Sequence, residues 1–137
     1  MSEEDWAGAR AAHARGDYAT ELRIYRRLAD NGDARAQDNI GVIYERGLGV
    51  TKSYAEAMKW YRMAAERGYF QVDLGEVCEN EGDVVEALKW YEIARMTNFS
   101  EANALYDQLS RKMSPEQIAE AHGQAVQFKI IPPTLDY

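Results

Sequence analysis

The chain has 137 residues, of which 46% are hydrophobic and 28% charged, with a formal net charge of −7 and a pI of about 4.9. This length predicts one domain with one continuous core. The acidic balance disfavours nucleic acids and anionic membranes as partners, because both require clustered lysine and arginine. There is no apolar run of about 18 residues and no apolar signal segment at the N-terminus. Cys78 is the single cysteine, which excludes an internal disulfide, so we expect a cytoplasmic protein.

The first 114 residues contain no proline, and glycine with aspartate or serine divides them into short segments. Glycine is typical of a helix C-cap, and aspartate or serine of the next N-cap. Ser53 with Glu56, and Ser114 with Gln117, have the spacing of a capping box. These signals predict eight helices, joined by short connections into four antiparallel hairpins. The predicted helices span residues 4–15, 18–31, 34–46, 53–67, 70–81, 84–97, 100–112 and 115–128.

A nine-residue stretch occurs twice, thirty residues apart: EAMKWYRMA at 56–64 and EALKWYEIA at 86–94, with six identical positions. Self-similarity at a period of about 20–50 residues is typical of repeat architectures. In the first copy, small and large side chains alternate on one face of a helix. We therefore expect Trp60 and Trp90 to belong to the core and not to stack on a ligand.

The first helices of two hairpins align through Ile40-Gly41 and Leu74-Gly75. A glycine inside a helix costs about 1 kcal/mol relative to alanine. We expect close backbone-to-backbone packing inside the hairpin to offset that cost. Two differences between the repeats also carry predictions. Glu21 stands where the other repeats have alanine, which predicts looser packing of the first hairpin, and the fifth helix lacks two residues at its start.

Residues 34–68 read ARAQDNIGVIYERGLGVTKSYAEAMKWYRMAAERG and closely resemble the Sel-one-like repeat (SLR), a branch of the tetratricopeptide-repeat (TPR) superfamily. The matching elements are Ala-x-Ala-Gln, Ile-Gly-x-x-Tyr, Gly-x-Gly-Val, Tyr-x-x-Ala, Trp-Tyr, Ala-Ala and a closing glycine. The flanking copies look like ordinary TPR units, because Gly16-Asp17 and Gly82-Asp83 lead directly into the second helix. The ending is similar to the closing helix of bacterial arrays, so the resemblance covers residues 1–128.

The resemblance implies an all-α fold, a right-handed α/α superhelix (solenoid) of about four antiparallel helix hairpins with a C-terminal capping helix. We expect a single repeat domain over residues 1–137, with a concave face that binds proteins or peptides. Its parts would be repeats at about 1–32, 33–68 and 69–98, a closing hairpin at 99–129 and a tail at 130–137. The apolar tail contains two consecutive prolines, which predict polyproline-like extension. Docking on its own chain is a hypothesis, with a groove of a neighbouring copy as the alternative.

Catalysis and metal binding find little support in the pattern. His13 and His122 lie 109 residues apart, have acidic neighbours no closer than chance would give, and form no cluster with Cys78. Cys78 occupies the position of Tyr44 in its repeat, which predicts a small buried hydrophobe. The string GLGVTKS lacks the order of a phosphate-binding loop and follows a predicted helix, so we interpret it as a longer turn. We predict no enzymatic activity, no cofactor and no metal.

In the family that the chain resembles, the first helix of each hairpin lines the concave face. Counting from the two glycine anchors gives ten candidate partner-binding residues: Trp6, Arg10, His13, Arg35, Asp38, Val42, Glu45, Val72, Glu76 and Glu79. Trp6 has a competing role, burial against the second helix. Residues 73–86 contain six carboxylates and no basic residue, for which a solvated face is the simpler interpretation. The sharper hypothesis is that Glu45, Glu76 and Glu79 hold a basic or amphipathic segment of a partner.

The predicted function is therefore that of a non-catalytic protein–protein interaction adaptor or scaffold, which binds a partner protein or peptide in its concave groove. One alternative is a cognate inhibitor of the immunity type that neutralises a toxin or an enzyme. Such an inhibitor would have one tight partner, whereas an adaptor would have several weaker ones. An enzyme or small-ligand binder would require a cluster of titratable groups that the pattern does not contain.

Overall fold

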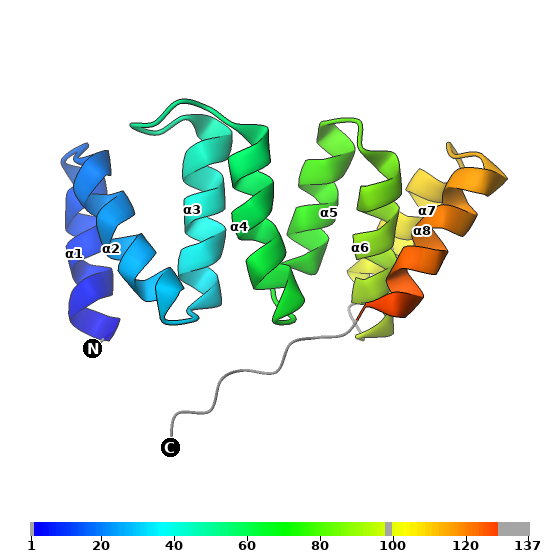
Figure 1. The fold of residues 1–137 in the computed structure, drawn as a ribbon, viewed down its shortest axis with the longest axis horizontal. Coiled ribbons are helices and arrows are strands. Elements are labelled where there is room, and N and C mark those ends of the chain that lie inside the picture. Colours follow the sequence, from blue (N-terminus) through cyan, green and yellow to red (C-terminus); the bar gives the residue numbers. More distant parts are fainter. Residues whose placement is uncertain (1, 98–99, 129–137) are drawn as a thin grey trace, which may run out of the picture. The chain divides into compact units, whose positions relative to one another are not determined.

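The computed structural model describes residues 2–97 and 100–128, and all regular elements in those ranges are α-helices (Figure 1). The described residues form two compact units, divided between Tyr69 and Phe70. The tail predicted at 130–137 lies outside the described residues. The single repeat domain expected over residues 1–137 stays a prediction.

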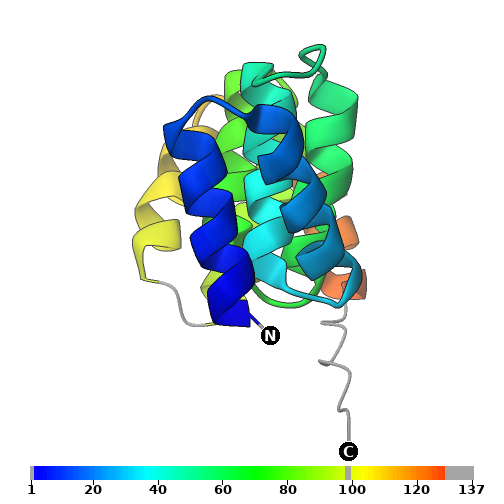
Figure 2. The ribbon, with the colours of Figure 1, turned by 90° about the vertical axis from the view of Figure 1, so that its left-hand side faces the viewer.

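The first unit contains four helices, each packed against the next along the chain. They are α1 (Ser2–Ala14), α2 (Tyr18–Asp30), α3 (Ala34–Arg46) and α4 (Tyr54–Glu66). Figure 2 shows α1 and α2 side by side and antiparallel. The core of this unit combines large side chains with alanines that let the helices approach closely. Its buried members are Ala9, Tyr25, Leu28, Ala29, Ala36, Ile40, Ile43 and Trp60.

The second unit contains α5 (Gln71–Asn80), α6 (Val84–Met96), α7 (Glu101–Ser110) and α8 (Pro115–Gln127). Helix α6 is central, since it packs against α5, α7 and α8. Trp90 of α6 is buried, and the ring of Phe128 meets it edge-on with 5.2 Å between the ring centroids. The burial predicted for both repeat tryptophans is therefore confirmed, as is that of Cys78.

Side chains that cap helix N-termini explain why the predicted helix bounds agree with the structure to within two residues. Asp17 accepts a hydrogen bond from the Thr20 backbone N–H, and Ser53 accepts one from that of Glu56. Ser114 and Gln117 form a complete capping box, in which each side chain accepts from the other's backbone N–H. Each cap satisfies a backbone donor that the first helical turn leaves free.

Helices α5 and α7 differ, because their N-cap residues, Phe70 and Ser100, have no side-chain cap hydrogen bond. Phe70 also has a left-handed φ of 61°. A non-glycine residue in this conformation costs about 1–2 kcal/mol. Helix α5 has 10 residues against 13 in α3, which confirms the prediction that its start is shortened.

The connection between α3 and α4 is the GLGVTKS segment, and the structure confirms it as a turn. Gly47 ends α3 in the left-handed conformation with φ of 70°. Gly49 has φ of 73°, and a Cβ built on it would lie 2.6 Å from Cβ of Tyr18. Only glycine fits there, because both the backbone angle and the neighbouring side chain exclude a Cβ.

Candidate interaction site

A tyrosine of α4 packs on a glycine of α3 and donates a hydrogen bond to a glutamate one turn further along. A Cβ built on Gly41 would overlap the ring of Tyr61, so no side chain fits at this position. The Tyr61 hydroxyl donates to Oε1 of Glu45. Burial and then Glu45 raise the pKa of Tyr61 well above its usual value. The prediction of backbone-to-backbone packing is therefore wrong, because an aromatic ring occupies the space beside the glycine.

The hairpin of α5 and α6 repeats this arrangement. A Cβ built on Gly75 would lie 2.5 Å from the Tyr91 ring, and the Tyr91 hydroxyl donates to Oε1 of Glu79 at 2.8 Å. Burial and then Glu79 raise the pKa of Tyr91 in the same direction. Glu45 and Glu79, which we predicted to face a partner, thus each accept a hydrogen bond from the tyrosine of their own hairpin.

The first hairpin has a histidine–glutamate pair where the next two have a tyrosine–glutamate hydrogen bond. His13 precedes Tyr25 by twelve residues, the same number that separates Glu79 from Tyr91, so His13 occupies the glutamate position. The carboxylate comes instead from the second helix, where Glu21 is 4% exposed. His13 Nδ1 lies 3.1 Å from both carboxylate oxygens of Glu21. Burial and then Glu21 raise the pKa of Tyr25 to about 12.

Both histidines therefore have a carboxylate partner, which corrects our interpretation that their acidic neighbours are no closer than chance. His122 Nδ1 of α8 lies 2.7 Å from Oε1 of Glu92 on α6. Both imidazoles are largely exposed, whereas Glu21 and Glu92 are mostly covered. These pairs join helices of one unit, as expected for residues at the edge of a core.

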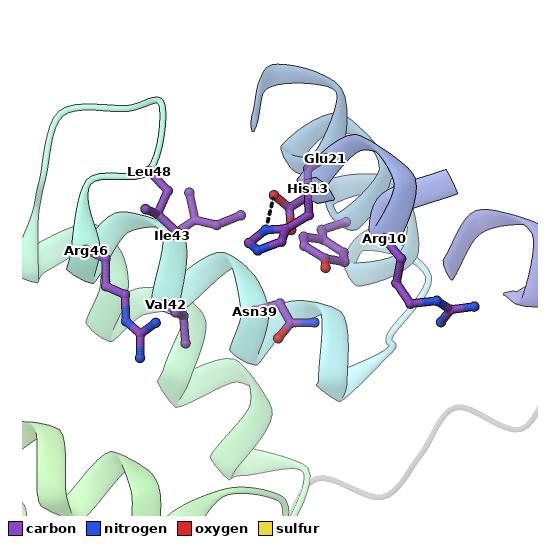
Figure 3. Close-up of a pocket in the computed structure, with 9 residues that line it drawn as sticks. Arg10, His13, Glu21, Asn39, Val42, Ile43, Arg46 and Leu48 are labelled. Carbon is purple, nitrogen blue, oxygen red and sulfur yellow. Dashed lines mark hydrogen bonds and ion pairs between the residues drawn. The ribbon is translucent and has the colours of Figure 1, made fainter. Parts of the chain in front are cut away.

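A cavity of about 280 Å³ opens between α1, α2 and α3 of the first unit. Figure 3 shows His13 and Asn39 in its centre, with Arg10 and Arg46 on opposite sides. Apolar side chains form part of the wall. The lining residues are Arg10, His13, Glu21, Tyr25, Asn39, Val42, Ile43, Arg46 and Leu48. A concave apolar surface with a few convergent polar groups is typical of a binding pocket.

An acidic surface lies in the second unit, on α5 and the start of α7. Partial burial and then Glu101 raise the pKa of Asp73. Partial burial and then Asp73, Glu101 and Glu79 raise the pKa of Glu76. The smaller, electrostatic part of these shifts comes from neighbouring carboxylates, and no described cation contributes an opposing effect.

The remaining predicted residues have varied surroundings. Trp6 is half-buried with its ring centroid 5.6 Å from that of Tyr25, which confirms its burial against the second helix. The Arg35 guanidinium lies 4.6 Å from the centroid of the Trp6 ring. The exposure predicted for Val72 is wrong, because this side chain is 8% exposed and packs in the core of the second unit. It belongs to the first turn of α5 and packs in one cluster with Ala94 of α6 and Ala102 of α7.

Three of the ten predicted residues line the cavity, namely Arg10, His13 and Val42. Our prediction missed Asn39 and Arg46, which lie three residues before and four after Val42 on the same helix face. The prediction instead chose the neighbouring face of α3, which contains Asp38 and Glu45. Partner binding at all ten positions stays a prediction.

The described residues contain no group of three or more histidine, cysteine or acidic side chains placed to hold a metal ion. None of the helices in the described part of the chain is long and apolar enough to cross a membrane.

Comparison with known proteins identifies the fold. The structure superposes on that of a protective antigen present in uropathogenic Escherichia coli strains, which displays an SLR fold, with a TM-score of 0.72 and 27% identity. The match covers 90% of this chain and 29% of the other. The family model described as Sel1 repeat matches residues 34–69 and 71–96. Residues 34–69 and 71–96 are therefore Sel1-like repeats. The fold class of the chain is an all-α helical solenoid, as the resemblance implied.

Two curated proteins illustrate how this Sel1-like repeat chain relates to longer ones. It is 25% identical over 100 residues to a sel1-like repeat-containing protein of Acanthamoeba polyphaga mimivirus, covering 72% of this chain and 19% of that protein. It is 39% identical over 74 residues to an F-box protein of Arabidopsis thaliana, covering 53% of this chain and 20% of that protein. The chain thus spans about a fifth of these relatives. Sel1 repeats generally mediate protein–protein interaction and are typically non-catalytic scaffolds.

Proposed function

We propose that the chain is a non-catalytic adaptor or scaffold that binds partner proteins, and that the acidic surface of α5 and α7 binds a basic segment of such a partner. The observation that carries this proposal is the group of three carboxylates formed by Asp73, Glu76 and Glu101. After desolvation, which is the larger cause, Asp73 and Glu101 raise the pKa of Glu76 and Glu101 raises that of Asp73, and no described lysine or arginine pairs with them. A lysine or arginine from a partner would relieve this repulsion, so its binding is favoured electrostatically.

Of the three glutamates that the sequence suggested for partner binding, only Glu76 belongs to this surface. Glu45 and Glu79 accept hydrogen bonds from Tyr61 and Tyr91, so replacing them would disturb the packing of their hairpins. Glu76 has no such role and is exposed. The residues to test are therefore Asp73, Glu76 and Glu101.

The test is affinity capture from native lysate with mass spectrometry, using wild type and the variant Asp73→Asn/Glu76→Gln/Glu101→Gln. The control is Glu81→Gln/Glu116→Gln/Glu120→Gln, which removes the same charge from exposed positions of the same unit. We expect the first variant to lose proteins with exposed basic segments that the control retains. Equal retention by both variants would refute the basic-segment proposal. Recovery of one cognate partner, in place of several, would favour the inhibitor alternative.

Acidification provides a second readout. A basic partner binds the ionised carboxylates, and the pKa of Glu76 is raised above its usual 4.5. Retention of a capped lysine-rich peptide should therefore decrease as the pH falls and Glu76 becomes protonated. The triple variant should show weaker retention that depends less on pH.

A further inference from the structure

We propose that the cavity between α1, α2 and α3 binds an acidic side chain within a partner's polypeptide, with Arg10 or Arg46 at its rim pairing with the carboxylate. This surface lies in the first unit and is independent of the acidic surface on α5. The inference rests on the proposed role in protein binding, and it names the chemistry of a second contact.

The first argument is that the two rim arginines lack an ion-pair partner among the described residues. In the same unit, Arg15, Arg27 and Arg35 each pair with an aspartate. Arg10 and Arg46 form no ion pair or hydrogen bond with any described residue, although the chain carries a net charge of −7. Two unpaired guanidinium groups beside one cavity, on an otherwise acidic protein, are complementary to an anion from outside.

The second argument concerns the carboxylate already present in the cavity. Glu21 is buried and lies 3.1 Å from His13 Nδ1 through both of its oxygens. Glu21 is therefore paired with His13 and does not form an ion pair with either arginine at the rim. Asn39 adds a half-buried amide that can donate a hydrogen bond, since no described residue pairs with its side chain.

The third argument is the apolar wall, which favours a side chain of a polypeptide over a free anion. Val42, Ile43 and Leu48 line the cavity together with its polar groups. They can pack against the methylene groups of a glutamate and against an apolar neighbour in the same peptide. A free phosphate would gain nothing from this wall, because it has no apolar group to pack against it. The volume of about 280 Å³ suits one or two side chains and is small for a larger ligand.

The proposal is tested by NMR titration of the full-length chain with a capped, amidated pentapeptide that has glutamate between two leucines. The matched peptide has glutamine in place of glutamate. The guanidinium N–H resonances of Arg10 and Arg46 report on the site. We expect a saturable shift with the glutamate peptide and about tenfold weaker binding of the glutamine peptide, since a charge-assisted hydrogen bond is about twice as strong as a neutral one.

Two double variants complete the experiment. Arg10→Gln/Arg46→Gln should reduce affinity for the glutamate peptide at least about tenfold. The control Arg23→Gln/Lys52→Gln removes two exposed charges of the same unit and should bind as wild type. All four positions are exposed, so the variants should fold, which circular dichroism checks.

Several results would overturn the proposal. They are the absence of a saturable shift with the glutamate peptide at millimolar concentration, equal affinity for the two peptides, or unchanged affinity of the arginine variant. Binding only of peptides with a free C-terminus would identify a chain end as the ligand, and equally tight binding of inorganic phosphate would identify a free-anion site. Both contradict an internal acidic side chain. Because the α5 variant leaves this cavity intact, failure here is distinguishable from failure of the basic-segment proposal.

Discussion

Replacing Gly41 by alanine should destabilise the protein even though alanine is the better helix former. In an exposed helix the change would contribute about 1 kcal/mol of stability. Here the new Cβ overlaps the Tyr61 ring, and forcing a side chain into a packed core costs about 1–3 kcal/mol. Moving the ring also weakens the hydrogen bond from Tyr61 to Glu45, and a bond to a charged group is worth about 1.5–3 kcal/mol. We expect a net loss of about 2 kcal/mol.

The assay is urea unfolding followed by circular dichroism, with Gly123→Ala as the matched control. Gly123 lies inside α8, and a Cβ built on it meets nothing within 4 Å, so this variant should gain about 0.5–1 kcal/mol. In a Tyr61→Leu background, the cost of Gly41→Ala should largely disappear, since the clashing ring is absent. A Gly41→Ala protein as stable as wild type, or more stable, would refute the role we give to the ring.

Three further predictions follow from the core and the caps. Tyr61 and Tyr91 have raised pKa values, so above pH 10.0 the folded chain binds more protons than the unfolded one. Stability should therefore fall as the pH rises, by about 1.4 kcal/mol per pH unit for each tyrosine, measured by urea unfolding alongside tyrosinate absorbance. Ser114→Ala removes the cap of α8 and should cost about 1 kcal/mol in the same assay, whereas Ser114→Asp should retain the cap. Cys78 is 0% exposed, so a thiol reagent should label it only at the rate of opening, and immediate labelling of the native protein would contradict its burial.

The sequence predicts the helices well because their ends are marked by local chemistry. A left-handed glycine followed by a capping aspartate ends one helix and begins the next at Gly32-Asp33 and at Gly82-Asp83. The repeat of Trp60 at Trp90 likewise identifies core positions, because equivalent residues in a repeat array have equivalent burial. Both inferences use information that lies within a few residues or recurs at a fixed period.

Contacts between side chains of different helices are harder to predict from the sequence, because they depend on how the surfaces of the two helices pack against each other. Gly41 signals a close approach, but whether backbone or ring fills the space is decided only when α4 packs on α3. The change from alanine to Glu21 signals an irregular first hairpin, yet its partner His13 lies across a turn on another helix. The cavity was missed for the same reason. Val42 belongs to two neighbouring faces of α3, and the glycine anchors select the face whose other residues, Asp38 and Glu45, do not line the cavity.

The first two hairpins carry their hydrogen-bonded glutamate on different helices. This difference makes the whole hairpin, and not the single helix, the unit that could be exchanged between such proteins. In the second hairpin the acidic group, Glu45, is on the first helix, whereas in the first hairpin it is Glu21 of the second helix. A chimera that joined α3 to α2 would bring Glu45 and Glu21 together, and two carboxylates would compete for one partly buried position. The opposite chimera, α1 joined to α4, would offer the Tyr61 hydroxyl an imidazole in place of its carboxylate acceptor. We therefore expect crossovers at the turns between hairpins to be tolerated, and crossovers inside a hairpin to be destabilising.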